Sequence, residues 1–173
     1  MYFCKGEKIK VLLLTPDFPP AVGGIQKLLY NYAKYTKSDL TVMAPFSQAG
    51  MPDLPGVVKS FDKTQGFKVL RIPKSRSKLW VLVMLLKVIK IAAKEKLVVL
   101  FCGHIVVGPI GYIVKKLFGI PYIIYIYGLE IFITESKIKS FILRHALIVF
   151  VINEFCRNRL LKLGVREDNI KKL

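Results

Sequence analysis

Short runs of apolar residues alternate along this chain with segments whose apolar residues recur at helical spacing, and this alternation constrains the possible folds most strongly. The runs lie at residues 10–15, 39–45, 67–73, 97–102, 122–127 and 146–152. Continuous apolar runs are typical of strands buried on both faces of a sheet. Strands separated by helices form right-handed crossover units. We therefore predict one α/β domain with a doubly wound, Rossmann-like parallel sheet.

The segments between these runs predict helices. Helical spacing is found over residues 78–96, 107–118, 135–144 and 154–163, and in the segment that begins at Ile25. Gly119 is expected to end the second of these helices. Residues 56–61 predict a weaker β-like segment, whereas residues 46–55, rich in Pro, Gly, Ser and Gln, favour a loop. The apolar residues on which we base the helical pattern at 78–96 are Leu79, Leu82, Val83, Leu86 and Ile89.

The chain is strongly basic, with 28 Lys and Arg residues against 11 Asp and Glu residues and a net charge of +17. This excess implies an anionic partner such as nucleic acid, lipid headgroups or a phosphorylated substrate. Lys87 and Lys90 interrupt the best candidate for a spanning helix, which needs about 20 apolar residues. No signal-peptide pattern is found, and the cysteines lack metal-ligand spacing. We expect a cytoplasmic protein without a metal site, peripheral to the inner face of the membrane if it binds lipid.

Gly23 and Gly24 stand between the first strand and the first helix, in the segment TPDFPPAVGGIQKLL. Glycines at such a junction let a ligand approach the backbone, and the helix N-terminus offers unpaired N–H groups to a phosphate. The spacing differs from the GxGxxG dinucleotide fingerprint. Two interpretations stay open from these residues alone: an anion-binding loop, or a tight turn without a ligand.

The same segment resembles the start of family 4 glycosyltransferases, which are retaining enzymes of the two-domain GT-B fold. LFCGHIVVGPIGYIVKKLFGIPYIIYIYGLE and ALIVFVINEFCRNRLLKLGVREDNIKKL continue the resemblance, so that it covers essentially the whole chain. It implies that residues 1–173 are the N-terminal, acceptor-side domain of such an enzyme. It also implies a nucleotide-sugar donor, UDP- or GDP-linked, whose diphosphate faces Gly23 and Gly24. No tightly bound cofactor and no metal are implied.

The resemblance assigns roles to residues that follow three of the strands. His104 matches the first histidine of the family, and Tyr127 stands where many members have the second. Tyrosine is neutral near pH 7, with an ordinary pKa of about 10, which makes it a poor base but a good partner for a sugar hydroxyl or a phosphate. Tyr127 and His104 are thus the candidate catalytic residues. Gly128, Glu130 and Asn153 are candidate substrate-binding residues, and Asn153 also suits the cap of the last helix.

A basic segment with a tryptophan at its head gives a second candidate surface. One interpretation is a face that lies on anionic lipid, which would suit a lipid-linked acceptor. The other is a solvated lysine face on a helix that packs against the sheet. Nucleic acid is disfavoured as the anionic partner, because the chain has no recognisable nucleic-acid-binding motif. The segment comprises Lys74, Arg76, Lys78, Trp80, Lys87, Lys90 and Lys94.

The resemblance also implies a C-terminal donor-binding domain, in cis or in trans, that supplies most contacts to the donor. We expect residues 1–173 alone to be inactive as a sugar transferase. Two alternatives stay open. The chain can be a membrane-docking or binding subunit of a split transferase without catalytic activity, or an unrelated Rossmann-like nucleotide-binding module.

Overall fold

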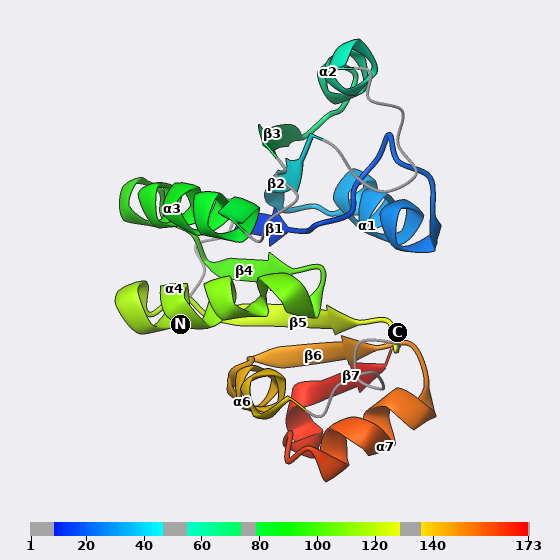
Figure 1. Ribbon diagram of the computed structural model, residues 1–173, viewed down its shortest axis with the longest axis vertical. Helices are drawn as coiled ribbons and strands as arrows, with labels where there is room; N and C mark the ends of the chain where they lie inside the picture. Colours follow the sequence, from blue (N-terminus) through cyan, green and yellow to red (C-terminus); the bar gives the residue numbers. More distant parts are fainter. Residues whose placement is uncertain (1–8, 47–54, 74–78, 129–135, 173) are drawn as a thin grey trace.

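The computed structural model describes residues 9–46, 55–73, 79–128 and 136–172. Within them the strands form one seven-stranded parallel sheet in the order β3-β2-β1-β4-β5-β6-β7 (Figure 1). This order confirms the predicted Rossmann-like sheet. The strands are β1 (Lys10–Leu14), β2 (Asp39–Pro45), β3 (Lys68–Ile72), β4 (Val99–Cys102), β5 (Tyr122–Ile126), β6 (Ile148–Val151) and β7 (Ile170–Lys172).

Helices cover both faces of the sheet. Side chains of α1 and α2 belong to the apolar cluster on one face, and those of α3, α4, α6 and α7 belong to the cluster on the other. The helices are α1 (Gly24–Tyr35), α2 (Pro55–Lys63), α3 (Leu79–Lys94), α4 (Gly108–Phe118), α6 (Lys137–His145) and α7 (Glu154–Lys162), with short 3-10 helices η1 (Ile105–Val107) and η2 (Glu167–Asn169).

In strand β1, residues 11–14 are all apolar because both faces of the strand are covered. Val11 and Leu13 point into the cluster beneath α1, whereas Leu12 and Leu14 point into the cluster on the opposite face. All four side chains are buried. Because successive residues of a strand face opposite sides, a strand covered twice needs apolar residues at every position.

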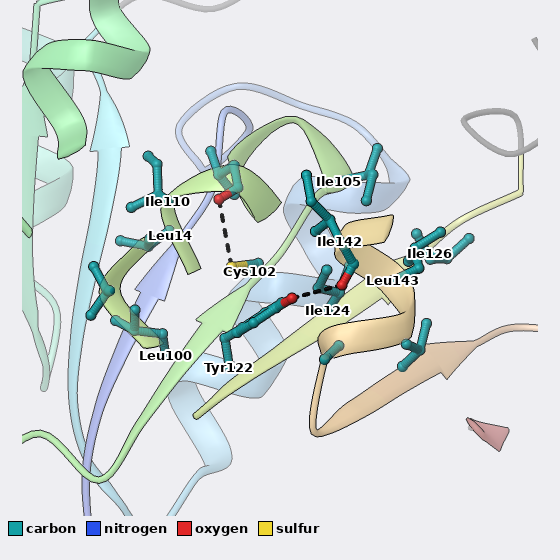
Figure 2. Packing of buried hydrophobic residues seen from close by; sticks show 14 of the residues in the cluster. Leu14, Leu100, Cys102, Ile105, Ile110, Tyr122, Ile124, Ile126, Ile142 and Leu143 are labelled. Atoms are coloured by element: carbon teal, nitrogen blue, oxygen red, sulfur yellow. Dashed lines mark hydrogen bonds between the residues drawn. The ribbon is translucent and has the colours of Figure 1, made fainter. Parts of the chain in front are cut away.

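The larger cluster is built around β4, β5 and the helices α4 and α6 (Figure 2). The hydroxyl of Tyr122 donates to the carbonyl oxygen of Ile142 at 2.6 Å, so the one polar atom of this buried ring has a partner. Burial raises the pKa of the Cys102 thiol to about 12. A Cβ at Gly111 would lie 2.8 Å from the ring of Tyr122, so only glycine lets α4 approach β5 this closely.

One predicted element is corrected, and one element was not predicted. Residues 56–61 form part of helix α2, not a strand: Val58 is buried and Phe61, three residues later, is partly buried, a helical spacing that the β-branched valines concealed. Strand β7 was not predicted. It is a short edge strand in which Ile170 alone is buried, so its sequence carries almost no apolar signal.

Helix α3 buries a different face from the one that the sequence suggested. Trp80, Met84 and Val88, at intervals of four residues, point into the core. Leu79, Leu82 and Leu86 are instead exposed. Among the described residues, no helix is both long enough and apolar enough to span a bilayer.

Candidate functional site

The carboxyl ends of the seven parallel strands lie at one edge of the sheet, where the arrowheads in Figure 1 point. The chain winds outward in one direction from β1 to β3 and in the other from β4 to β7. β1 and β4 are therefore neighbours at the point where the order reverses, which is where ligands bind in open α/β sheets. The loop after β1 leads to α1, and the turn after β4 leads to η1.

The loop after β1 begins with a hydrogen-bonded turn. The buried hydroxyl of Thr15 donates to the carbonyl oxygen of Asp17 at 2.9 Å and accepts from the backbone N–H of Asp17 at 3.1 Å. Phe18 then inserts its ring into the cluster beneath α1 and is fully buried. The start of the loop is thus anchored to the sheet before the chain reaches Gly23.

Helix α1 begins at Gly24 without a capping side chain from the described part of the chain. Gly23 occupies the N-cap position, and its carbonyl oxygen accepts the first helical hydrogen bond, from Lys27 N, at 3.0 Å. The first N–H groups of a helix have no partners within the helix, and the helix dipole places partial positive charge there. This end of α1 therefore suits an anion.

The backbone at these glycines does not require glycine. Gly23 has an extended conformation (φ 170°) that any residue adopts. A Cβ at Gly24 would meet no atom of the described residues within 4 Å, and a Cβ at Gly23 would meet only the flexible end of the Gln26 side chain. Neither a turn conformation nor internal packing thus explains Gly24. Open space in front of a helix N-terminus is what close approach of a ligand would need.

A hollow of about 530 Å³ lies against this loop. Its lining comprises residues 19–24 together with Lys27, Tyr30 and Phe61. Lys27 is the one charged residue among the described residues that line it, and its side chain is exposed. The hollow thus joins a cationic side chain, the N-terminus of α1 and two aromatic rings.

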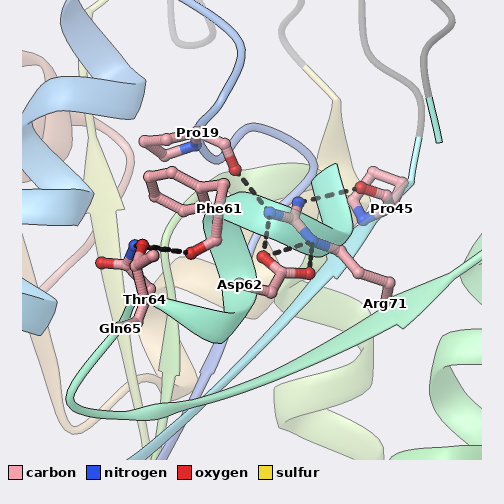
Figure 3. A network of polar contacts seen from close by, with 7 residues as sticks. All are labelled: Pro19, Pro45, Phe61, Asp62, Thr64, Gln65 and Arg71. Atoms are coloured by element: carbon pink, nitrogen blue, oxygen red, sulfur yellow. Dashed lines mark hydrogen bonds and ion pairs between the residues drawn. The ribbon is translucent and has the colours of Figure 1, made fainter. Parts of the chain in front are cut away.

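A buried ion pair between Arg71 and Asp62 supports the loop after β1 (Figure 3). Arg71 of β3 donates from Nε and Nη2 to the two carboxylate oxygens of Asp62, at 3.0 and 2.8 Å. Its Nη1 donates to the carbonyl oxygen of Pro45, and its Nη2 also donates to that of Pro19. The side chain of Arg71 is only 3% exposed. One guanidinium therefore connects the loop, the end of β2 and helix α2.

His104 and Tyr127 lie together at the ends of β4 and β5. The rings stack with centroids 6.4 Å apart and planes inclined by 26°. The hydroxyl of Tyr127 donates to the carbonyl oxygen of Gly103 at 2.9 Å, and Nδ1 of His104 accepts from Val106 N at 3.1 Å. Because Nδ1 accepts, a neutral His104 ring carries its proton on Nε2. The predicted pair is thus brought together, with one polar atom of each ring engaged by the backbone.

The remaining predicted substrate residues are placed as follows. Gly128 is buried with φ 122°, a conformation that favours glycine, so the turn after β5 accounts for it. Asn153 caps α7, because its Oδ1 accepts from Cys156 N at 2.8 Å, and this confirms the predicted cap. Glu130 lies outside the described residues.

The predicted sites do not share one hollow. Neither His104 nor Tyr127 belongs to the lining of the hollow beside Gly24 among the described residues. They share the carboxyl edge of the sheet with it. Sequence reasoning missed Thr15, Arg71 and Asp62, which position the loop. The only sequence signal was a charged residue, Arg71, between the apolar residues Leu70 and Ile72 near the end of a predicted strand.

The basic segment is placed only in part. Lys74, Arg76 and Lys78 lie outside the described residues. Trp80 does not head an exposed patch as predicted, because its side chain packs in the core and is 9% exposed. The three lysines of α3 that belong to the segment are exposed: Lys87, Lys90 and Lys94.

No protein-family model matches the sequence, and no curated protein resembles it significantly. Solved structures do. HepE of Anabaena in complex with UDP matches with a TM-score of 0.68 and 17% identity, over 95% of this chain and 43% of its own. Sucrose-phosphate synthase of Thermosynechococcus elongatus matches with a TM-score of 0.68 and 12% identity, over 95% and 47%. UDP-GlcNAc 2-epimerase of Methanocaldococcus jannaschii matches with a TM-score of 0.61 and 18% identity, over 95% and 45%.

At such low identities these likenesses show the fold. The chain has the Rossmann-like α/β fold of a domain of GT-B glycosyltransferases, a fold that the epimerase shares. It spans less than half the length of each of these structures.

Proposed function

We propose that this chain is the acceptor-side half of a retaining, family 4 glycosyltransferase that moves a sugar from a UDP- or GDP-sugar to an acceptor. The observation that carries the proposal is the N-terminus of α1, open in front of Gly24 at the carboxyl edge of the sheet. A fold shared with HepE, which was solved with UDP-glucose, supports a nucleotide sugar as the anionic ligand.

In this proposal the donor diphosphate approaches Gly23 and Gly24. The first N–H groups of α1 bind its oxygens, and Lys27 contributes a positive charge beside them. A donor-binding domain, in cis or in trans, supplies the other counter-charges. Without that domain, residues 1–173 neutralise only part of the negative charge of the diphosphate. They therefore have negligible transferase activity on their own.

His104 and Tyr127 orient the sugar and the acceptor in this proposal, and Gly128, Glu130 and Asn153 contribute to substrate binding. The Nε2–H of a neutral His104 donates to a hydroxyl or phosphate oxygen. The phenol oxygen of Tyr127 accepts from a sugar hydroxyl while its own proton is held by the carbonyl of Gly103. Tyr127 thereby positions substrate and is not the base. The acceptor is a sugar or a lipid-linked molecule, and the protein is peripheral to an anionic membrane.

The diphosphate site is tested by replacing Gly24 with leucine. Because the space in front of Gly24 is open, the variant folds, but its side chain occupies the place of the phosphate. We expect the amide NMR shifts that UDP or GDP causes at residues 24–26 to be lost. Gly56→Leu is the matched control, since Gly56 also stands in the first turn of a helix and has open space.

Equal nucleotide binding by the two leucine variants would contradict the diphosphate site. Tight binding of NAD, measured by calorimetry, would favour the unrelated nucleotide-binding module. Sugar transfer by the separate chain, followed as release of UDP or GDP, would contradict the need for a donor-binding domain.

A further inference from the structure

An apolar hollow lies between helices α3, α4 and α6, on the face of the sheet that these helices cover. Its volume is about 630 Å³, and all of its described lining residues except Ser136 and Lys139 are apolar. The hollow is distinct from the one beside Gly24, which lies against α1 and α2 of the opposite face. No residue that we assign to sugar transfer lines it.

The rim of this hollow exposes apolar side chains from α3, η1 and α6. Leu82 of α3 is 52% exposed, Val106 of η1 is 43% exposed, and Ile138 of α6 is 69% exposed. Contiguous apolar patches of this kind on a protein surface mark sites of contact with a partner or a membrane. The hollow and its rim therefore form one apolar surface.

Helix α3 extends this surface along its length. Leu79, Leu82 and Leu86 are spaced i, i+3 and i+7, so they lie on one side of the helix, and Leu79 and Leu86 are 62% and 54% exposed. Lys90 and Lys94 follow four and eight residues after Leu86 and continue the same exposed stripe. α3 thus buries Trp80, Met84 and Val88 inward and presents leucines and then lysines outward.

The lysine and arginine residues of α3, α4 and α6 are not balanced by any acidic residue within these helices. Helices α3, α4 and α6 contain no Asp or Glu. A basic protein partner would find no carboxylate on them, whereas an anionic bilayer offers both negative headgroups for the lysines and an apolar interior for the leucines. The lysine and arginine residues of these three helices are Lys87, Lys90, Lys94, Lys115, Lys116, Lys137, Lys139 and Arg144.

We infer that the α3–α4–α6 face docks on an anionic lipid bilayer. The exposed leucines of α3 and Ile138 enter the boundary between headgroups and acyl chains, and the lysines contact the phosphates. The inference rests on the membrane-peripheral part of the proposed function and names the surface that serves it. This face takes the place of the predicted patch headed by Trp80, which is buried.

The test is binding of the whole chain to phosphatidylcholine vesicles with and without phosphatidylglycerol, measured by co-sedimentation. We expect binding only with the anionic lipid, and a decrease as salt is raised. The triple variant Leu79→Ser, Leu82→Ser and Leu86→Ser should bind at least about tenfold more weakly, since it removes the groups that enter the bilayer. Tyr35→Ser is its control, because Tyr35 is 72% exposed on α1 of the opposite face.

The charge contribution is tested with Lys90→Gln, Lys94→Gln and Lys137→Gln together, which should weaken binding by about fivefold for each lysine that contacts the surface. The control removes the same charge from α1 and α2, at Lys34, Lys59 and Lys63, all exposed. Circular dichroism confirms that each variant is folded.

The inference would be overturned if the leucine variant or the lysine variant lost no more vesicle binding than its control. It would also be overturned if the wild type bound neutral vesicles as strongly as anionic ones. The inference would also be overturned if the wild type does not bind vesicles but forms a dimer in analytical ultracentrifugation that the leucine variant abolishes. That result would assign the face to contact with a second copy of the chain. The two proposals can fail separately. If the chain binds vesicles through this face but transfers no sugar when its donor-binding half is present, the proposed transferase function is contradicted and the docking face is still supported.

Discussion

Replacing Arg71 with methionine should destabilise the fold and free the loop that leads to Gly24. The substitution keeps an unbranched side chain in β3 but removes the guanidinium that pairs with Asp62 and donates to the carbonyl oxygens of Pro19 and Pro45. The Asp62 carboxylate, which is 18% exposed, and the carbonyl groups of Pro19 and Pro45 then lose the guanidinium as their hydrogen-bond donor. The change therefore combines a broken ion pair with lost hydrogen bonds.

The size of the effect follows from burial. Removing one partner of a buried ion pair costs about 3–5 kcal/mol. Water reaches part of the Asp62 carboxylate, so we take the lower end, about 3 kcal/mol, of a total stability that is typically about 5–15 kcal/mol. With a urea m-value of about 2 kcal/mol/M, the midpoint of unfolding should fall by about 1.5 M.

The assay is urea unfolding followed by circular dichroism, with amide hydrogen exchange of Asp17, Phe18, Ala21 and Val22 measured in parallel. Lys68→Met is the matched control, because Lys68 is an exposed cation on the same strand, and its effect should stay within about 0.5 kcal/mol. A double-mutant cycle with Asp62→Asn should give a coupling of at least about 1 kcal/mol. Additive single effects, or a loss at Arg71 no larger than that at Lys68, would refute the reasoning.

Two further predictions concern titratable groups. Burial raises the pKa of the Cys102 thiol to about 12, so Cys102 should resist alkylation at neutral pH until the protein unfolds; modification at the rate of a free thiol, detected by mass spectrometry, would contradict this. A hydrogen bond from Lys172 is the main cause that lowers the pKa of Glu154 below its ordinary value of 4.5. This pair therefore stabilises the fold above that value and ceases to do so as the pH falls through the lowered pKa. Lys172→Gln should therefore raise the pKa of Glu154 in an NMR titration, and an unchanged pKa would exclude the contact.

The sheet could be predicted because β4, β5 and β6 are apolar at every position and β1 is apolar after Lys10, a pattern that half-exposed strands or surface helices do not share. Local caps could also be predicted. Asn153 caps α7 through its side chain, and Gly119 ends α4 in a left-handed conformation with φ 71°. In each case the interaction lies within a few residues, so the sequence contains both partners side by side.

The features that could not be predicted depend on distant partners or on a helix with two apolar sides. Arg71 contacts Asp62, Pro45 and Pro19, which are 9, 26 and 52 residues away, and only the folded sheet brings them together. In α3, apolar residues surround most of the axis, so periodicity alone did not show that Trp80 faces inward and Leu82 outward. The sequence therefore predicted the helix but assigned its faces wrongly.

The hydrogen bond from Tyr127 to Gly103 makes the side chain at position 127 a support for the neighbouring strand end. The phenol spans the gap between the ends of β4 and β5 and donates to a backbone carbonyl of the neighbouring strand. An imidazole is shorter, so Tyr127→His would withdraw that donor and leave Gly103 to find another. The tyrosine thus links the end of β5 to the end of β4, and an imidazole at this position would not make that link.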